Sequence, residues 1–226
     1  MASKLKYGFV AALALGASSA FAGTIFSTAG DGTGYLGYGT SVTDGHQGLE
    51  FGDEVVLPTA GYVFTGLTFD YIAVSGGGTA TLNIYDNAGG TVIQGSARPN
   101  TLLATFFNIP INEGENTATI SYSGGALILP ERFTYTISFN GNSTAGLAVG
   151  GSTSTVGRPH ENVGSSGSDY WQRTGTGADD WALNGISGNY GNFKVTVTAN
   201  VPEPTTVALG VVGAAVLVGA SLRRRR

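Results

Sequence analysis

The chain of 226 residues contains no cysteine. Disulfides, thiol nucleophiles, iron–sulfur clusters and cysteine-based zinc sites are therefore excluded. Histidine is nearly absent as well, since only His46 and His160 occur. No G-x-S-x-G segment is present, so a Ser-His-Asp hydrolytic site is not expected. The fold must be stabilised by its apolar core and by hydrogen bonds between strands.

Basic residues are scarce between residues 23 and 200. This stretch has fourteen acidic residues and five basic ones, a net charge of −9, against −4 for the whole chain. The five are Arg98, Arg132, Arg158, Arg173 and Lys194. Such a surface repels polyphosphate and anionic lipid, so no nucleic acid partner is expected.

The same stretch lacks the 3.6-residue apolar stripe of an amphipathic helix. It shows short apolar–polar alternations of period two, which are typical of strands with one buried face. We expect strands over 49–57, 62–74, 79–86, 101–109, 117–122, 132–139 and 192–199. Within 62–74, one face is expected to carry Val63, Thr65, Leu67, Phe69 and Tyr71, and the other Tyr62, Phe64, Gly66, Thr68 and Asp70.

Glycine is abundant, with 37 residues, but no strict third-residue period indicates collagen. Gly- and Asn-rich breaks at 75–78, 86–90, 112–116 and 140–143 separate the apolar runs and suit tight turns. Strands at about 8–12-residue spacing predict an all-β domain over 23–200, an antiparallel β-sandwich of the jelly-roll type. The region 146–191 is expected to be loop-rich.

Residues 1–22 have the layout of a secretory signal peptide. Lys4 and Lys6 precede an apolar stretch over 9–17, and Ala20 and Ala22 fit an A-x-A cleavage site. We expect cleavage after Ala22. The alternative is an N-terminal membrane anchor, which the shortness of this stretch disfavours because a bilayer core is ~30 Å thick.

Residues 201–226 consist of a short segment with two prolines, an apolar run and four terminal arginines. The uncharged run 205–222 would span about 27 Å as a helix, close to the thickness of a bilayer core. It is followed by the cationic cluster Arg223, Arg224, Arg225 and Arg226. We expect this cluster to stay on the cytoplasmic side and stop translocation. The alternative is a buried core helix with a basic end.

Pro202 and Pro204 hold the preceding segment extended and display Glu203. This Pro-Glu-Pro motif, followed by the apolar helix and the arginines, resembles the bacterial PEP-CTERM sorting signal. Strands 51–55, 62–71 and 192–199 are similar to those of β-rich domains with this tail. The resemblance implies that an exosortase-type membrane protease recognises Pro202, Glu203 and Pro204 and cleaves nearby. A competing interpretation keeps the helix as a permanent single-pass anchor.

The resemblance implies an exported protein of exopolysaccharide-producing bacteria and no general enzymatic activity. We therefore expect a structural or adhesive protein, not an enzyme, held first in the membrane by its C-terminal helix. It would then reach the cell surface or the extracellular matrix. Two alternatives stay open: a carbohydrate-binding module that retains exopolysaccharide, and a hydrolase that acts on polysaccharide.

Paired carboxylates are the candidates for glycoside hydrolysis. They are Asp53/Glu54, Glu113/Glu115 and Asp179/Asp180. Adjacent residues on a strand point to opposite faces, so Asp53/Glu54 is expected to be a poor acid/base pair. The pair at 113 and 115 flanks a turn glycine, where solvated charge is the simpler expectation.

No cofactor is expected, although calcium is a candidate because it binds carboxylate and amide oxygens. The loops supply Asp31, Asp44, Asp86, Asn87, Asp169, Asp179 and Asp180. None of these fits a D-x-D-x-D-G pattern, so no ligand is assigned and the metal remains unknown.

Four aromatic residues gather in the loop-rich region: Tyr170, Trp171, Trp181 and Tyr190. Exposed together, they would form a ligand platform on which sugar rings could stack. The alternative is that Trp171 and Trp181 close one end of the core.

Overall fold

The computed structural model describes residues 22–28, 50–74, 77–140, 145–148, 165–167, 169–177, 179–185 and 193–200. They belong to one compact unit, which spans Phe21–Pro202. The described residues contain no α-helix, and every strand pairing among them is antiparallel. The all-β, antiparallel prediction is confirmed.

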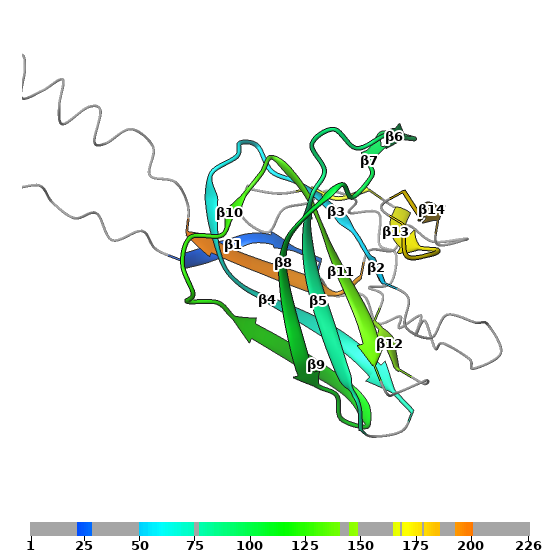
Figure 1. The fold of residues 1–226 in the computed structure, drawn as a ribbon. Coiled ribbons are helices and arrows are strands. Elements are labelled where there is room, and N and C mark those ends of the chain that lie inside the picture. The colour runs from blue at the N-terminus through cyan, green and yellow to red at the C-terminus, as the bar shows by residue number, and fades with distance from the viewer. Residues whose placement is uncertain are drawn as a thin grey trace, which may run out of the picture. The chain divides into compact units, whose positions relative to one another are not determined.

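The first sheet has β4 at its centre. Its main path runs β1 (Ala22–Ser27), β15 (Val195–Asn200), β4 (Tyr62–Ala73) and β10 (Ile128–Leu129). Two further strands, β9 (Gly114–Ser121) and β12 (Ala145–Leu147), also pair with β4. The first and last strands of the domain are therefore neighbours, although more than 160 residues separate them (Figure 1).

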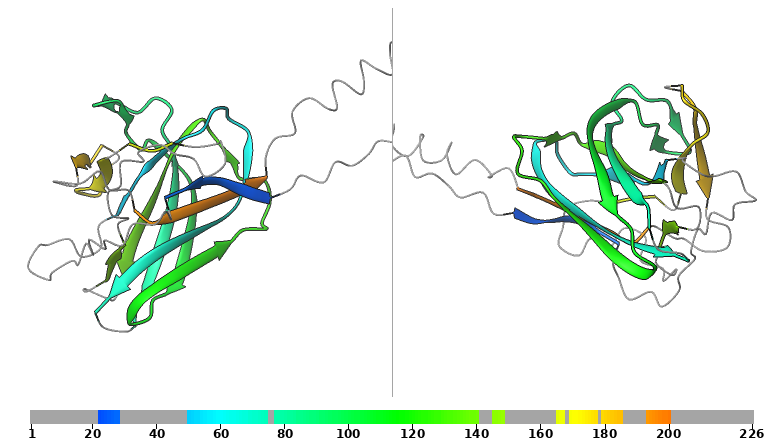
Figure 2. Two further views of the ribbon diagram at one scale, coloured as in Figure 1. Left: turned by 180° about the vertical axis from the view of Figure 1, so that it is seen from behind. Right: turned by 60° about the horizontal axis from the view of Figure 1, so that its bottom comes forward.

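The second sheet lies against the first (Figures 1 and 2). Its path is β14 (Trp181–Gly185), β13 (Asp169–Arg173), β2 (Phe51–Gly52), β11 (Arg132–Asn140), β5 (Thr79–Asp86) and β8 (Thr101–Pro110). Strand β3 (Glu54–Val56) also pairs with β11, and β6 (Val92–Ile93) forms a small hairpin with β7 (Ser96–Ala97).

The core fills the space between the two sheets. On β15 and just before it, Phe193, Val195 and Val197 are buried, while the intervening Lys194, Thr196 and Thr198 are partly exposed, as predicted. Ala80, Leu82 and Ile84 on β5 do the same for the second sheet, each fully buried. Two facing sheets with such inner faces fit a sandwich.

The predicted faces of 62–74 are wrong, because β4 changes face in mid-strand. Tyr62 and Phe64 are buried, but so are Leu67 and Phe69. The register with β15 shifts between Thr198 and Ala199, which inserts an extra residue into β4 and forms a bulge. Gly66 permits this bulge, since a Cβ there would lie 2.5 Å from the Ile120 carbonyl oxygen.

Most of the predicted targeting residues lie outside the described residues. These are residues 1–21, with Ala20, and residues 201–226, with Pro202, Glu203, Pro204 and Arg223 to Arg226. Ala22 is the first residue of β1. Within the described part of the chain, no helix is long and apolar enough to cross a bilayer.

Candidate functional site

The outer face of the second sheet, turned away from the core, is covered by other parts of the chain. Polar residues that a strand would normally show to water are buried there: Asn83, Asn87, Thr134 and Thr136. Together with Glu50, Glu54 and Tyr85, we call them the covered face. Buried polar groups need partners, and two carboxylates supply many of them.

Glu50 accepts four hydrogen bonds. One oxygen, Oε1, receives Asn83 Nδ2 at 2.8 Å and Arg173 Nη1 at 3.2 Å. The other, Oε2, receives the Tyr85 hydroxyl at 2.7 Å and Thr136 Oγ1 at 3.3 Å. Its side chain is only 15% exposed. Burial, with the adjacent carboxylate of Glu50, raises the pKa of Tyr85 above its usual range, so this phenol is a hydrogen-bond donor and not a base.

A small aromatic cluster adjoins Glu50. Tyr85 and Trp181 meet edge to face with their ring centroids 5.4 Å apart, and Trp171 belongs to the same buried cluster. The guanidinium of Arg173 lies over the Trp181 ring, 5.6 Å from its centroid. The Arg173 guanidinium and the Trp181 ring therefore contact other residues of this protein.

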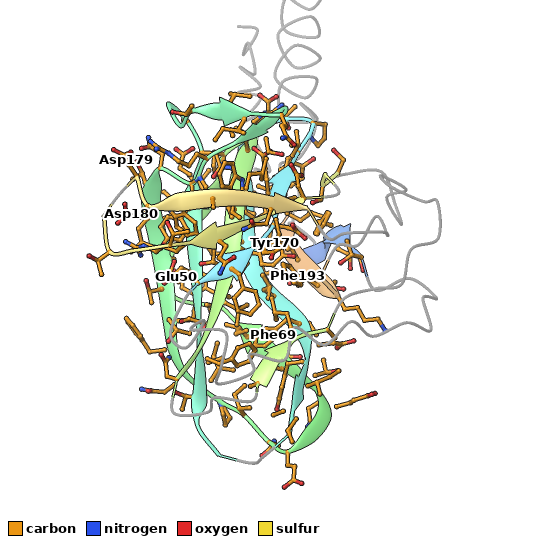
Figure 3. All side chains as sticks on the ribbon, turned by 90° about the vertical axis from the view of Figure 1, so that its right-hand side faces the viewer. Glu50, Phe69, Tyr170, Asp179, Asp180 and Phe193 are labelled. Atoms are coloured by element: carbon orange, nitrogen blue, oxygen red, sulfur yellow. The ribbon has the colours of Figure 1, made fainter. Side chains whose placement is uncertain are left out.

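Three of the four residues of the predicted ligand platform are buried. Trp171 is fully buried, Trp181 is 9% exposed, and Tyr170 is 4% exposed. Tyr170 points to the other face of its strand, where it packs edge to face on Phe193 at 5.5 Å (Figure 3). Tyr190 lies outside the described residues. The three rings form no exposed stacking surface, so they do not support a carbohydrate site.

The second carboxylate of the covered face, Glu54, holds the β6–β7 hairpin to the sheet. It accepts hydrogen bonds from the Ala97 backbone amide at 3.1 Å and from Asn87 Nδ2 at 3.1 Å. Arg132 Nη1 adds an ion pair at 3.4 Å. Asn87 also exchanges hydrogen bonds with Thr134 at 2.9 and 3.1 Å. The hairpin is therefore fixed through polar contacts.

Asp53 points the opposite way, into the core. Its Oδ2 accepts from the Phe193 amide at 3.3 Å and from the Tyr135 hydroxyl at 3.4 Å. Its Oδ1 is buried and has no hydrogen-bond partner among the described residues. Burial, with a smaller effect of the Asp169 charge, raises the pKa of Asp53 well above its usual range. Burial and Asp53 together raise the pKa of Tyr135.

Asp53 and Glu54 point to opposite faces of the strand, as predicted. The other carboxylate pairs serve simpler roles. Glu113 and Glu115 are exposed, as predicted. Asp179 forms an ion pair with Arg98 at 2.5 Å, and Asp180 accepts the Gly177 amide at 2.6 Å.

The calcium candidates that the structure describes hydrogen-bond to other parts of the protein. Asp86 accepts the Ala88 amide in a turn at 2.7 Å, and Asp169 accepts Ser96 Oγ at 3.3 Å. In the part of the chain that the structure describes, no three His, Asp or Glu side chains gather as metal ligands would. Asp31, Asp44, His46 and His160 lie outside it, and calcium binding stays a prediction.

Sequence reasoning missed Glu50 as the centre of this network. The pattern that could have indicated it is the two-residue spacing of Glu50, Gly52 and Glu54, which places all three on one face of a strand.

Comparisons of the chain with protein-family models, with curated proteins and with solved structures find no match. The function must therefore be argued from the residues and their geometry.

Proposed function

We propose that this chain is the precursor of an exported structural or adhesive β-sandwich protein, which a tail of the PEP-CTERM type delivers to the cell surface or the extracellular matrix. Signal peptidase would remove residues 1–22. An exosortase-type membrane protease would recognise Pro202, Glu203 and Pro204 while the helix 205–222 and the arginines hold the precursor in the membrane. The released sandwich would act without catalysis.

One observation carries this proposal. Strand β1 begins at Ala22 and β15 ends at Asn200, and these two residues are cross-strand partners. Strand β1 thus begins one residue before the proposed first cut, and β15 ends two residues before Pro202 of the motif. The first cut would remove Ala22 and its pairing with Asn200, but it would keep the other β1–β15 partners, from Gly23 with Ala199 to Ser27 with Thr196. A cut beyond Asn200 would leave β15 whole.

The end strands are anchored well enough to survive such processing. Ile25 and Phe26 on β1 are 1% and 4% exposed, and Val195 and Val197 on β15 are 1% or less. Full burial of one such side chain contributes about 1.5–3 kcal/mol. An extracellular domain without disulfides depends on anchoring of this kind.

The hydrolase alternative receives no support from the carboxylates. Glu50 is occupied by four donors, and Asp53 and Glu54 face opposite ways. The buried tryptophans likewise give the carbohydrate-binding alternative no aromatic platform. A structural or adhesive role requires neither feature.

The test is to follow the Glu203→Ala variant in the native host, with Glu131→Ala as the matched control, since Glu131 is an exposed acidic residue of the folded domain. Cells are fractionated and the chain is detected by immunoblot with an antibody against the sandwich. We expect the wild type and Glu131→Ala to appear shortened at the surface or in the medium. Glu203→Ala should accumulate uncut in the membrane fraction. Equal length and location of all three would contradict the proposal.

A further inference from the structure

The outer face of the first sheet carries hydroxyl side chains in register across four strands. Ser27 on β1, Thr196 on β15, Thr68 on β4 and Thr119 on β9 are successive cross-strand partners. The row beside it consists of Thr24, Thr198, Gly66 and Ser121, paired in the same way. We call the seven hydroxyl residues of these two rows the hydroxyl face.

The hydroxyl face meets solvent. Thr119, Ser121 and Thr24 are exposed, and the other four residues are partly exposed. The sheet that carries them is turned toward the viewer in the left view of Figure 2. Neighbouring strands lie about 4.8 Å apart. The two rows are two residues apart on β15, β4 and β9 and three apart on β1, where the register shifts between Thr24 and Phe26. The hydroxyl groups therefore form a grid with one gap, at Gly66.

Part of the hydrogen-bonding capacity of this grid is used within it. Thr68 and Thr119 share a hydrogen bond at 3.2 Å, Ser27 and Thr196 share one at 2.9 Å, and Thr198 donates to the Gly66 carbonyl at 3.2 Å. A hydroxyl group has one donor and two acceptor sites. These contacts orient the side chains, while the hydroxyl groups of the exposed Thr24, Thr119 and Ser121 remain accessible to a partner.

The residue types in the two rows indicate which class of partner could bind there. The two rows contain no charged and no aromatic residue. An apolar partner would strip water from the hydroxyl groups without replacing their hydrogen bonds. A polyanion would be repelled by a domain of net charge −9. That charge would attract a polycation to the domain as a whole, but the two rows hold no carboxylate, and Asp70 in the adjoining row is hydrogen-bonded to Thr117. An uncharged chain rich in hydroxyl groups can both donate to the grid and accept from it.

We propose that the hydroxyl face binds a neutral polysaccharide. A chain lying across the strands meets one row position about every 4.8 Å. Each contact contributes little, but a polymer repeats them and gains avidity. The proposal deepens the proposed function, since it names what a surface or matrix protein would adhere to. It places the sugar contact on β1, β15, β4 and β9 and not at the tryptophans.

The experiment is affinity electrophoresis of the purified full-length chain in a polyoxyethylene detergent, which brings no competing sugar. Native gels contain dextran, hydroxyethyl cellulose or, as the anionic comparison, alginate. The test variant is Thr68→Val with Thr196→Val, which removes two hydroxyl groups and keeps the side-chain shape. The control is Thr91→Val with Thr101→Val, two exposed threonines outside the first sheet.

We expect at least one neutral polymer to retard the wild type and the control equally, while alginate does not. The test variant should lose at least tenfold in apparent affinity at an unchanged unfolding temperature. Should that variant unfold, Thr119→Val at the exposed sheet edge replaces it, with a smaller loss expected. Absence of retardation by both neutral polymers, or equal retardation of the folded test variant, would overturn the inference. Purified protein needs no processing in the assay, so its failure is distinct from a failure of tail recognition.

Discussion

The outer faces of the two sheets both carry threonines, but these are buried on the second sheet and accessible on the first. On the second sheet, Thr134 and Thr136 are fully buried beneath other parts of the chain and hydrogen-bond to Asn87 and Glu50. On the first sheet, Thr68 and Thr119 remain accessible and bond to each other. The same alternation of threonine with apolar residues thus makes an internal polar layer in one place and a free surface in the other.

The difference teaches that burial of a polar strand face is decided by distant segments. The covered face exists because the β6–β7 and β13–β14 hairpins fold back over β5 and β11, fixed by Glu54, Glu50 and an aromatic cluster. Changes on the covered face should therefore affect folding, whereas changes on the hydroxyl face should affect binding.

The largest effect is expected at Gly52, under the covered face. A Cβ there would lie 1.8 Å from the Tyr135 carbonyl oxygen, so Gly52→Ala must push β2 away from β11. We expect a loss of about 3 kcal/mol or more in the free energy of unfolding. Gly23→Ala on β1 is the control, because nothing lies within 4 Å of its Cβ position. Similar urea midpoints for the two variants would contradict the geometry of this contact.

Glu50→Ala should cost nearly as much, about 2–3 kcal/mol, because Arg173 and three neutral donors lose their buried acceptor. The matched change on the other face is Asp70→Ala, where the carboxylate accepts Thr117 Oγ1 in an exposed pair at 2.7 Å. There we expect a loss below about 1 kcal/mol. Chemical unfolding of both variants measures the difference, and a larger loss for Asp70→Ala would reverse the comparison.

Asp53 makes the core itself sensitive to pH. Its pKa is raised in the folded state by burial, while an unfolded Asp titrates near pH 3.9. Between these two values folding takes up a proton, so this group destabilises the fold progressively as pH rises from about 4 to the raised pKa. The slope can reach about 1.4 kcal/mol per pH unit.

Asp53→Asn should remove this dependence, since the amide cannot ionise and its oxygen can still accept from the Phe193 amide. The measurement is the difference in unfolding free energy between wild type and variant at several pH values, which cancels the other titrating groups. A difference that stays constant with pH would show that Asp53 ionises as readily in the folded chain as in the unfolded one.

The smallest effects separate the two threonine environments directly. Thr134→Val removes the two buried hydrogen bonds that Thr134 exchanges with Asn87 and should cost about 1–2 kcal/mol. Thr68→Val should change stability by no more than about 0.5 kcal/mol. Thermal unfolding of the two isosteric variants gives the comparison, and equal costs would mean that the hydroxyl face also serves the fold.

Much of the fold could be predicted from the sequence because period-two alternation and Gly/Asn turns are local signals. They located the long strands, including β5, β8 and β11, and the alternation around Val195. They failed at β4, where the backbone bulge beside Gly66 reverses the faces and depends on the close approach of β9.

The covered face could not be predicted for a related reason. Alternation at Asn83 and Tyr85 indicates a polar outer face, but only the pairing of β13 with β2 brings Trp171 and Arg173 over it. The sequence predicts a loop-rich region over 146–191, and within its described part Trp171 and Trp181 lie on the paired strands β13 and β14. Contacts between residues about 90 to 120 positions apart, such as those of β13 and β14 with β2 and β5, produce no periodic pattern in the sequence of either segment.

The central claim, that this sandwich is freed from both a leader and a tail, is tested most directly by intact-mass analysis of the protein from its native host. We predict a species that begins at Gly23 and ends close to the motif at 202–204, without residues 205–226. A single full-length species in the cytosol, with both Met1 and Arg226 present, would contradict it.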